Sequence, residues 1–173
     1  MIRNKYIYIL TIITLALAGY FYFPNDRRGV SVPQFRDFPI SDIYQGIPVP
    51  VDLASSPIGH TFRTRLTQGA ERGPNFAGHY ALVTWGCGST CQNFAVVNAK
   101  TGKIYDIPFG SANGTEFRLD SNLLIVNPLM NDMGYDGSVP DWVRIEYYEW
   151  TGEEFKPLAM YKVSDGQMVL VKP

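Results

Sequence analysis

The residue types that could do chemistry gather between residues 73 and 91. This stretch contains Asn75 and His79, and His79 is one of only 2 histidines in the chain. Because a histidine titrates near neutral pH, His79 could act as the general base of a small hydrolase. Asn75 and a carboxylate, Asp120 or Glu146, would then complete the catalytic group. The competing interpretation is a structural histidine that bonds to backbone carbonyls. We prefer it, because the catalytic interpretation depends only on the density of unusual residues around His79.

The 2 cysteines of the chain, Cys87 and Cys91, indicate a disulfide. An even, closely spaced pair that follows an export signal is typical of an oxidised bridge. For so short a loop, chain entropy gives a stabilisation of about 2 kcal/mol. The Cys-x3-Cys spacing disfavours redox catalysis, and zinc would require His79 and a further ligand beside the two thiolates. We therefore predict a structural disulfide, no metal site and no cofactor.

Other catalytic signatures are absent from the sequence or occur in the wrong context. Ser89 lies between the cysteines and not in the Gly-x-Ser-x-Gly turn of serine hydrolases. Asp132, Asp136 and Asp141 do not have the spacing of an EF-hand calcium loop. A formal net charge of −1 without a basic stretch argues against a nucleic-acid partner. An enzyme is therefore a weaker hypothesis than a binding protein.

Aromatic residues suggest a binding surface. Trp85, Trp150, Tyr147 and Tyr148 lie in or at the ends of predicted strands. Neighbours along a strand point to opposite faces, so at least one of the two tyrosines should be free to contact a partner. The loop of residues 129–133 adds adaptable methionines, and ordinary core packing is the alternative. The predicted binding residues are Asn75, His79, Trp85, Ser89, Arg118 and Trp150.

The first 24 residues predict export. Arg3 and Lys5 precede residues 6–23, which carry no charge. At about 1.5 Å per residue such a helix would be roughly 27 Å long, close to the hydrocarbon thickness of a membrane. Small residues around position 17 offer a signal-peptidase site, so a cleaved, soluble protein is the alternative. We expect an uncleaved inner-membrane anchor, with the rest of the chain in the periplasm.

Beyond the anchor, the sequence predicts an arm and one domain. Residues 25–57 contain 5 prolines among apolar residues, which is typical of an extended arm lying on a domain. Residues 58–173 form the predicted extracytoplasmic β domain. It begins with a short helix over residues 61–70, for which Thr61 is the expected N-cap.

From residue 79 onward the pattern alternates with the period of β-strands. We expect strands over residues 80–85, 94–97, 103–107, 117–119, 123–126, 142–150, 155–163 and 168–171, most of them joined by tight turns. The sequence therefore predicts a mainly β fold, an antiparallel meander that forms a compact sandwich or a small barrel. Two similar hairpins, at residues 101–103 and 151–153, make propeller-blade-like units an alternative.

Two motifs resemble those of a group of uncharacterised exported bacterial proteins. These proteins carry an Asn-Phe-Ala-Gly-His-Tyr segment followed by a Thr-Trp-Gly-Cys-Gly-x-x-Cys turn, which residues 75–80 and 84–91 match. The resemblance extends roughly over residues 62–157. It implies export and a similar β fold, and it implies no activity.

Taken together, these features favour a membrane-tethered or secreted periplasmic binding protein. Its small size, rigid hairpins and spare aromatic residues fit a protein that docks on another protein or an envelope component. An inhibitor or immunity-type protein that acts on an envelope enzyme is one form of this hypothesis. The alternative is a small periplasmic hydrolase that uses His79 as its general base.

Overall fold

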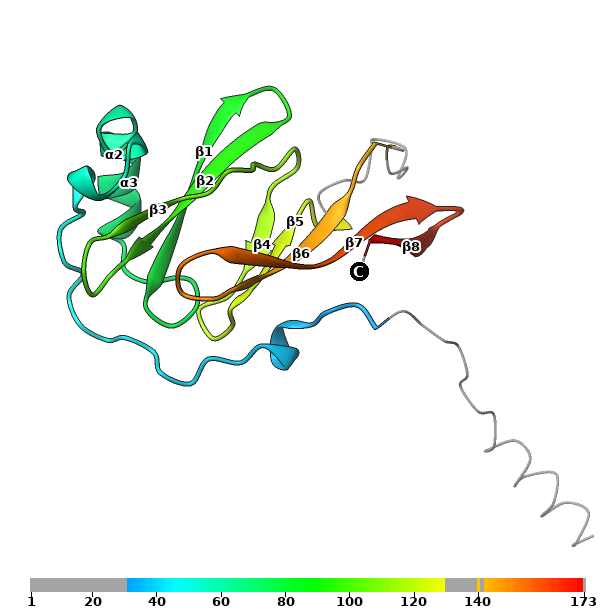
Figure 1. Cartoon of the computed structure of the whole chain (residues 1–173), viewed down its shortest axis with the longest axis horizontal. Coiled ribbons are helices and arrows are strands. Elements are labelled where there is room, and N and C mark those ends of the chain that lie inside the picture. Colours follow the sequence, from blue (N-terminus) through cyan, green and yellow to red (C-terminus); the bar gives the residue numbers. More distant parts are fainter. Residues whose placement is uncertain (1–30, 130–139, 141, 173) are drawn as a thin grey trace, which may run out of the picture. The chain divides into compact units, whose positions relative to one another are not determined.

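The computed structural model describes residues 31–129, 140 and 142–172 (Figure 1). From Val32 onward these residues belong to one compact unit. The predicted anchor, residues 6–23, and most of the loop with Met130 and Met133 lie outside the described residues. In the part of the chain that is described, no helix is long and apolar enough to cross a membrane.

Two antiparallel sheets make up most of the unit. Sheet A has the order β1-β2-β3 and sheet B has the order β4-β5-β6-β7-β8, so within each sheet the strands pair in the order of the sequence (Figure 1). This confirms the predicted mainly β fold and its meander, and within the described residues neither sheet closes into a barrel. The strands are Tyr80–Gly88, Cys91–Asn98 and Ile104–Asp106 in sheet A, then Thr115–Phe117, Leu123–Val126, Ile145–Trp150, Phe155–Ser164 and Gln167–Lys172 in sheet B.

The helical segments are short and precede sheet A. Two 3-10 turns, η1 (Phe35–Asp37) and η2 (Leu53–Ser55), are followed by α2 (Ile58–Thr61) and α3 (Arg63–Ala70). The expected N-cap at Thr61 is wrong, because the chain is already helical from Ile58. The break falls one residue later, at Phe62, where φ is −111° and ψ is 24°.

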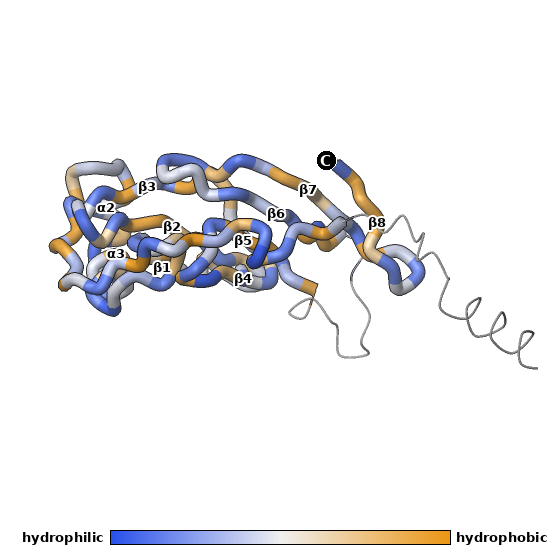
Figure 2. The backbone as a smooth tube through the Cα atoms, turned by 90° about the horizontal axis from the view of Figure 1, so that it is seen from below, coloured by the Kyte–Doolittle hydropathy of each residue, from blue (hydrophilic) through white to orange (hydrophobic). Residues whose placement is uncertain are grey.

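The main core lies between the two sheets. Leu82 and Phe94 project into it from sheet A, and Leu124 and Trp150 project into it from sheet B. The Trp150 ring packs edge-on against Tyr80 at a centroid distance of 5.4 Å. Burying one such large apolar side chain contributes roughly 1.5–3 kcal/mol, so this layer holds the sheets face to face. Figure 2 shows hydrophobic stretches along β2, β7 and β8.

Two smaller cores cover the outer faces of the sheets. Leu66 and Ala70 of α3 pack on the outer face of sheet A, against residues that include Val83 and Trp85. On the outer face of sheet B, Tyr147 and Tyr161 belong to a cluster that Phe35 and Phe38 join. Both faces of each sheet are therefore covered over part of their area.

Residues 32–57, called the arm below, run along both sheets. Ile40 N donates to Asp120 O at 2.8 Å beside sheet B, and Tyr44 N donates to Gly78 O at 2.9 Å. Farther along, Val49 N donates to Ala99 O at 2.9 Å, and Asp52 forms a parallel bridge with Lys103. The arm thus covers the β3 edge of sheet A, where unpaired backbone groups would otherwise face solvent.

Several predicted strand bounds need correction. The strand expected at residues 142–150 begins at Ile145, and Trp142 before it is 57% exposed. The strand expected at residues 117–119 ends at Phe117, because the carbonyls of Arg118 and Leu119 turn to accept hydrogen bonds from the backbone of Ala77 and Gly78. The bounds predicted for β5 are those of the structure.

Candidate functional site

The tip of the β1–β2 hairpin is closed by a disulfide. Cys87 and Cys91 are bonded, with their Cα atoms 5.1 Å apart, which confirms the predicted bridge. Residues 87–91, called the knuckle below, are all exposed. Thr90 has a φ of 51°, in the left-handed region that most residues avoid, so the tip is a tight turn. No residue of the knuckle belongs to any of the three hydrophobic clusters. The disulfide therefore fixes the shape of a surface feature and braces no core.

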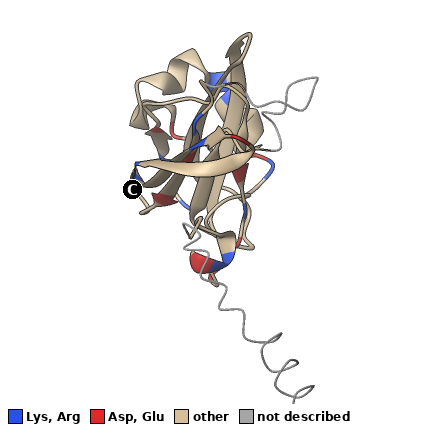
Figure 3. Cartoon of the chain, turned by 90° about the vertical axis from the view of Figure 1, so that its right-hand side faces the viewer, with Lys and Arg blue, Asp and Glu red and all other residues tan. Residues whose placement is uncertain are grey.

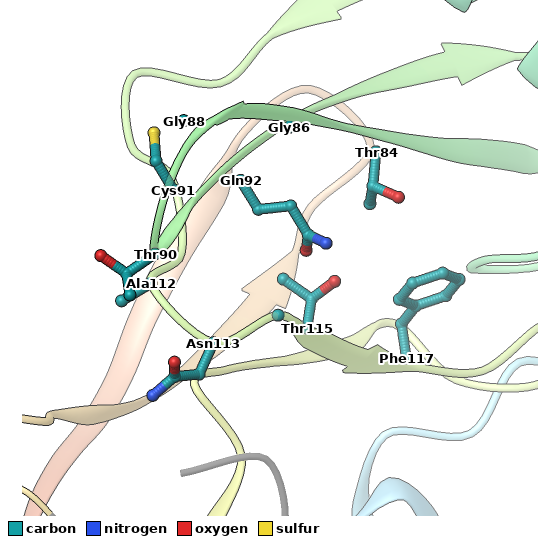
Figure 4. Close-up of a pocket in the computed structure, with 11 residues that line it drawn as sticks. Thr84, Gly86, Gly88, Thr90, Cys91, Gln92, Ala112, Asn113, Thr115 and Phe117 are labelled. Carbon is teal, nitrogen blue, oxygen red and sulfur yellow. The ribbon is translucent and has the colours of Figure 1, made fainter.

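Below the knuckle lies a groove of about 450 Å³. It is lined by β1, β2 and β4 and by the segment that leads into β4. Its main side chains are those of Thr84, Gln92, Asn113, Thr115 and Phe117. Figure 4 shows Gln92 reaching from β2 toward Thr115 of β4. The volume lies within the range of roughly 300–1,000 Å³ that is usual for ligand sites.

The groove is polar and uncharged. No Asp, Glu, Lys or Arg is among the described residues that line it. Elsewhere on the described chain, acidic and basic residues intermingle (Figure 3). The groove therefore offers hydrogen-bonding groups and no charge with which to hold a metal or an ionic ligand. Among the described residues, no group of three or more His, Cys, Asp and Glu side chains is placed to hold a metal ion.

His79 lines a different cavity, of about 350 Å³, at the start of β1. Asp42 of the arm, Asn122 and Trp150 line it as well. Burial lowers the pKa of His79 below its ordinary value, and the nearby Lys100 ammonium lowers it further, while Asp42 raises it. The Lys100 ammonium also lies 3.5 Å from the Asp42 carboxylate. His79 is thus mainly neutral near pH 7.

The two predicted tryptophans belong to cores. Trp85 is 8% exposed and its ring lies 4.7 Å from that of Phe62, behind sheet A. Trp150 is 2% exposed and lies between the sheets. Of the two tyrosines, Tyr147 is 6% exposed under the arm, while Tyr148 is half-buried and packs against the main core. Core packing, the alternative interpretation, describes these side chains.

Asn75 acts as a substitute strand. Its Oδ1 accepts from Leu82 N at 2.7 Å, and its Nδ2 donates to Leu82 O at 3.2 Å. The side-chain amide thus pairs with the free edge of β1 as a peptide group would. Gly78, in the same motif, has a φ of +80°, and a Cβ there would lie 2.5 Å from Asp42 O. These contacts give Asn75 and Gly78 structural roles.

The remaining predicted residues are dispersed. Arg118 is exposed, and its guanidinium carbon lies 4.4 Å from the centre of the Phe35 ring. Asp120 is exposed and does not line the His79 cavity; the carboxylate that does is Asp42. Ser89 lies in the knuckle.

His79 and the knuckle lie at opposite ends of β1, which spans roughly 27 Å at about 3.3 Å per residue. The structure therefore brings His79 and Trp150 together in one cavity and leaves Ser89 by another. Sequence reasoning missed Gln92, Asn113 and Thr115 of the groove. Single threonines, glutamines and asparagines carry no motif, and no signal in the sequence marks them.

No protein-family model, curated protein or solved structure matches this chain. The resemblance to exported bacterial proteins therefore stays an expectation.

Proposed function

We propose that this chain is an extracytoplasmic protein-binding module whose contact surface is the knuckle and the groove below it. The observation that carries the proposal is the position of the disulfide, which constrains an exposed hairpin tip away from every hydrophobic cluster. A loop held in one conformation loses less entropy when it binds, so such a bridge favours recognition. An inhibitor that presents this tip to an envelope enzyme fits the same surface.

The proposed compartment agrees with this chemistry. Disulfides persist in oxidising compartments, and the charged start and uncharged run of residues 1–23 have the pattern of an export signal. In the periplasm the bridge would stay closed and the knuckle would keep its shape. Membrane tethering through residues 6–23 is part of the same proposal.

Site-specific photocrosslinking in intact cells tests this surface. A photoreactive residue replaces Ser89 at the knuckle in the full chain, and a control variant carries it at Glu154, which is exposed in the β6–β7 turn. We expect one discrete crosslinked product from position 89 and none from position 154. Equal products from both positions, or none from position 89 in a folded, exported protein, would refute the proposal.

The hydrolase alternative has one favourable observation, the depressed pKa of His79, which keeps the imidazole able to accept a proton. A general base also needs a group that orients it. Among the described residues, no side chain forms a hydrogen bond with the His79 imidazole, and Asn75 is engaged with Leu82. The binding proposal therefore has the stronger support. Unchanged partner crosslinking in a His79→Gln variant is the result we expect.

A further inference from the structure

The edge of β1 turns free backbone groups toward the groove. Tyr80 N donates to Phe76 O at 3.0 Å and Leu82 N donates to Asn75 Oδ1, so these residues direct their peptide groups away from β2. Backbone direction alternates along an antiparallel strand, so Thr84 and Gly86 face the same way. Both are opposite residues of β2, but on the side that faces away from β2 no described residue bonds to the backbone of either.

β4 offers a second free edge to the same groove. Gly114 O accepts from Asn127 N at 2.9 Å, so position 114 faces β5. Glu116, two residues on and opposite Ile125, faces β5 as well. Thr115 and Phe117 therefore direct their backbone groups outward, and both residues line the groove. No described residue pairs with the backbone of either on that side.

Near Tyr80, at the end of β1 away from the knuckle, the chain itself lies between the edges of β1 and β4. The segment of residues 75–78 bonds to Tyr80 of β1 on one side. On the other side, Gly78 N donates to Leu119 O at 2.7 Å and Ala77 N to Arg118 O at 3.3 Å, just beyond β4. A tight turn of the chain, with positive φ at Ala77 and Gly78, therefore lies between the β1 side and the β4 side, and the groove continues this gap toward the knuckle.

We infer that the groove accepts an extended segment of a partner protein, which pairs with the open edges of β1 and β4 as an added strand. This inference rests on the proposed function and names the chemistry of the partner. Main-chain hydrogen bonds supply affinity in such complexes, and side-chain pockets supply specificity. Thr84, Gln92, Asn113 and Thr115 line the groove, and no charged residue does within the described part of the chain, so the segment carries small or β-branched, uncharged side chains.

One glycine keeps the groove open. A Cβ at Gly86 would meet nothing within 4 Å, and the φ of Gly86 lies outside the left-handed region. A larger side chain is therefore compatible with the fold and would take up room in the groove, which Gly86 lines, beside the added strand. Gly86→Leu should block the groove, and Gly86→Ala should disturb it little.

The decisive test distinguishes binding through the backbone of β1 from binding through its side chains. Thr84→Pro removes an N–H that the fold does not use, since edge strands tolerate proline where the N–H faces outward. Thr84→Val keeps that N–H and removes the hydroxyl. The probe is an uncharged, end-blocked hexapeptide of alternating threonine and valine, titrated into the detergent-solubilised full chain and followed by amide NMR.

We expect the peptide to slow hydrogen exchange at the amides of Thr84 and Gly86 and to shift those of Thr115 and Phe117. Thr84→Val should bind within about threefold of the original chain, and Thr84→Pro and Gly86→Leu should lose at least about tenfold, or 1.4 kcal/mol. A folded Thr84→Pro variant that binds equally, or a peptide that protects none of these amides at millimolar concentration, would overturn the inference.

Crosslinking distinguishes this failure from failure of the proposed function. If Thr84→Pro leaves the crosslink from position 89 intact, the knuckle is a binding surface and strand addition is wrong. If Thr84→Pro abolishes that crosslink while Thr84→Val preserves it, both proposals gain support. If position 89 never crosslinks but the peptide protects the β1 amides, strand addition stands and the knuckle is not the contact.

Discussion

Replacing Asn75 measures how much stability a side chain contributes when it acts as a strand. Asn75→Ala removes both hydrogen bonds to Leu82, at 2.7 and 3.2 Å. Each contributes roughly 0.5–1.5 kcal/mol net. Asn75 is exposed, so in the Asn75→Ala variant water can bond to the backbone of Leu82 and offset part of the lost stability. We expect the free energy of unfolding to fall by about 1–2 kcal/mol and Tm by roughly 3–8 °C.

In an Asn75→Asp variant the loss of stability should depend on pH. The carboxylate still accepts from Leu82 N, but it faces Leu82 O without a proton to donate. The loss should therefore match or exceed that of Asn75→Ala at pH 7. It should shrink as pH falls below about 4, where the carboxyl is protonated and can donate again.

Urea unfolding followed by tryptophan fluorescence measures these changes, because Trp85 and Trp150 are buried. Arg72→Ala, an exposed position three residues away, is the matched control and should change stability by less than about 0.5 kcal/mol. The reasoning fails if Asn75→Ala unfolds like the original chain yet loses the crosslink from position 89. That outcome would make Asn75 a binding residue, as the sequence suggested.

Three further perturbations follow from the structure. Gly102 and Gly166 both have positive φ, +77° and +71°, but only at Gly102 would a Cβ lie 2.2 Å from an arm carbonyl. Gly166→Ala should cost about 1–2 kcal/mol from backbone strain, and Gly102→Ala clearly more, measured as Tm; equal losses would contradict the arm contact. Replacing Cys87 and Cys91 with serine should lower the free energy of unfolding by about 2 kcal/mol and leave the far-ultraviolet circular dichroism unchanged, whereas loss of the β signal would show that the bridge supports the core. Burial, aided by nearby Tyr161 and Glu116, raises the pKa of Tyr147 from 10.0 to about 12. The folded state therefore favours the neutral phenol of Tyr147. Its contribution to the free energy of unfolding is fully present below pH 10 and is lost as pH rises toward 12. Tyr147→Phe should flatten the dependence of the free energy of unfolding on pH in this range.

Local pattern was enough to predict much of the fold. The alternation of apolar residues placed β5 at residues 123–126, and the Thr101-Gly102 turn placed the β2–β3 hairpin. These features depend on neighbours in the chain, which a period of two and a left-handed glycine encode directly. The same information assigned Tyr147 and Tyr148 to opposite faces correctly.

The errors arise where distant segments meet. The sequence placed Tyr147 and Tyr148 on opposite faces and predicted that at least one of them would be free, but it gave no sign that Phe35 and Phe38 of the arm cover the face of Tyr147. The groove follows the same logic. It needs the free edges of β1 of sheet A and β4 of sheet B, and strand periodicity gives the face of a residue without giving its neighbours across the sheets.

The contacts of the arm also set the order in which parts of the chain can pack during folding. The arm is synthesised before either sheet, yet the Phe35 carbonyl accepts a hydrogen bond from the hydroxyl of Ser121, 86 residues later. Phe35 and Phe38 therefore cannot pack until sheet B has formed. The outer-face cluster with Tyr147 and Tyr161 is covered only when the arm docks on it. Long-range contacts of this kind slow folding and leave apolar surface exposed in the meantime. The newly made chain thus passes through a stage with two matching apolar faces uncovered, during which a chaperone, or the arm of a second copy, can compete for sheet B.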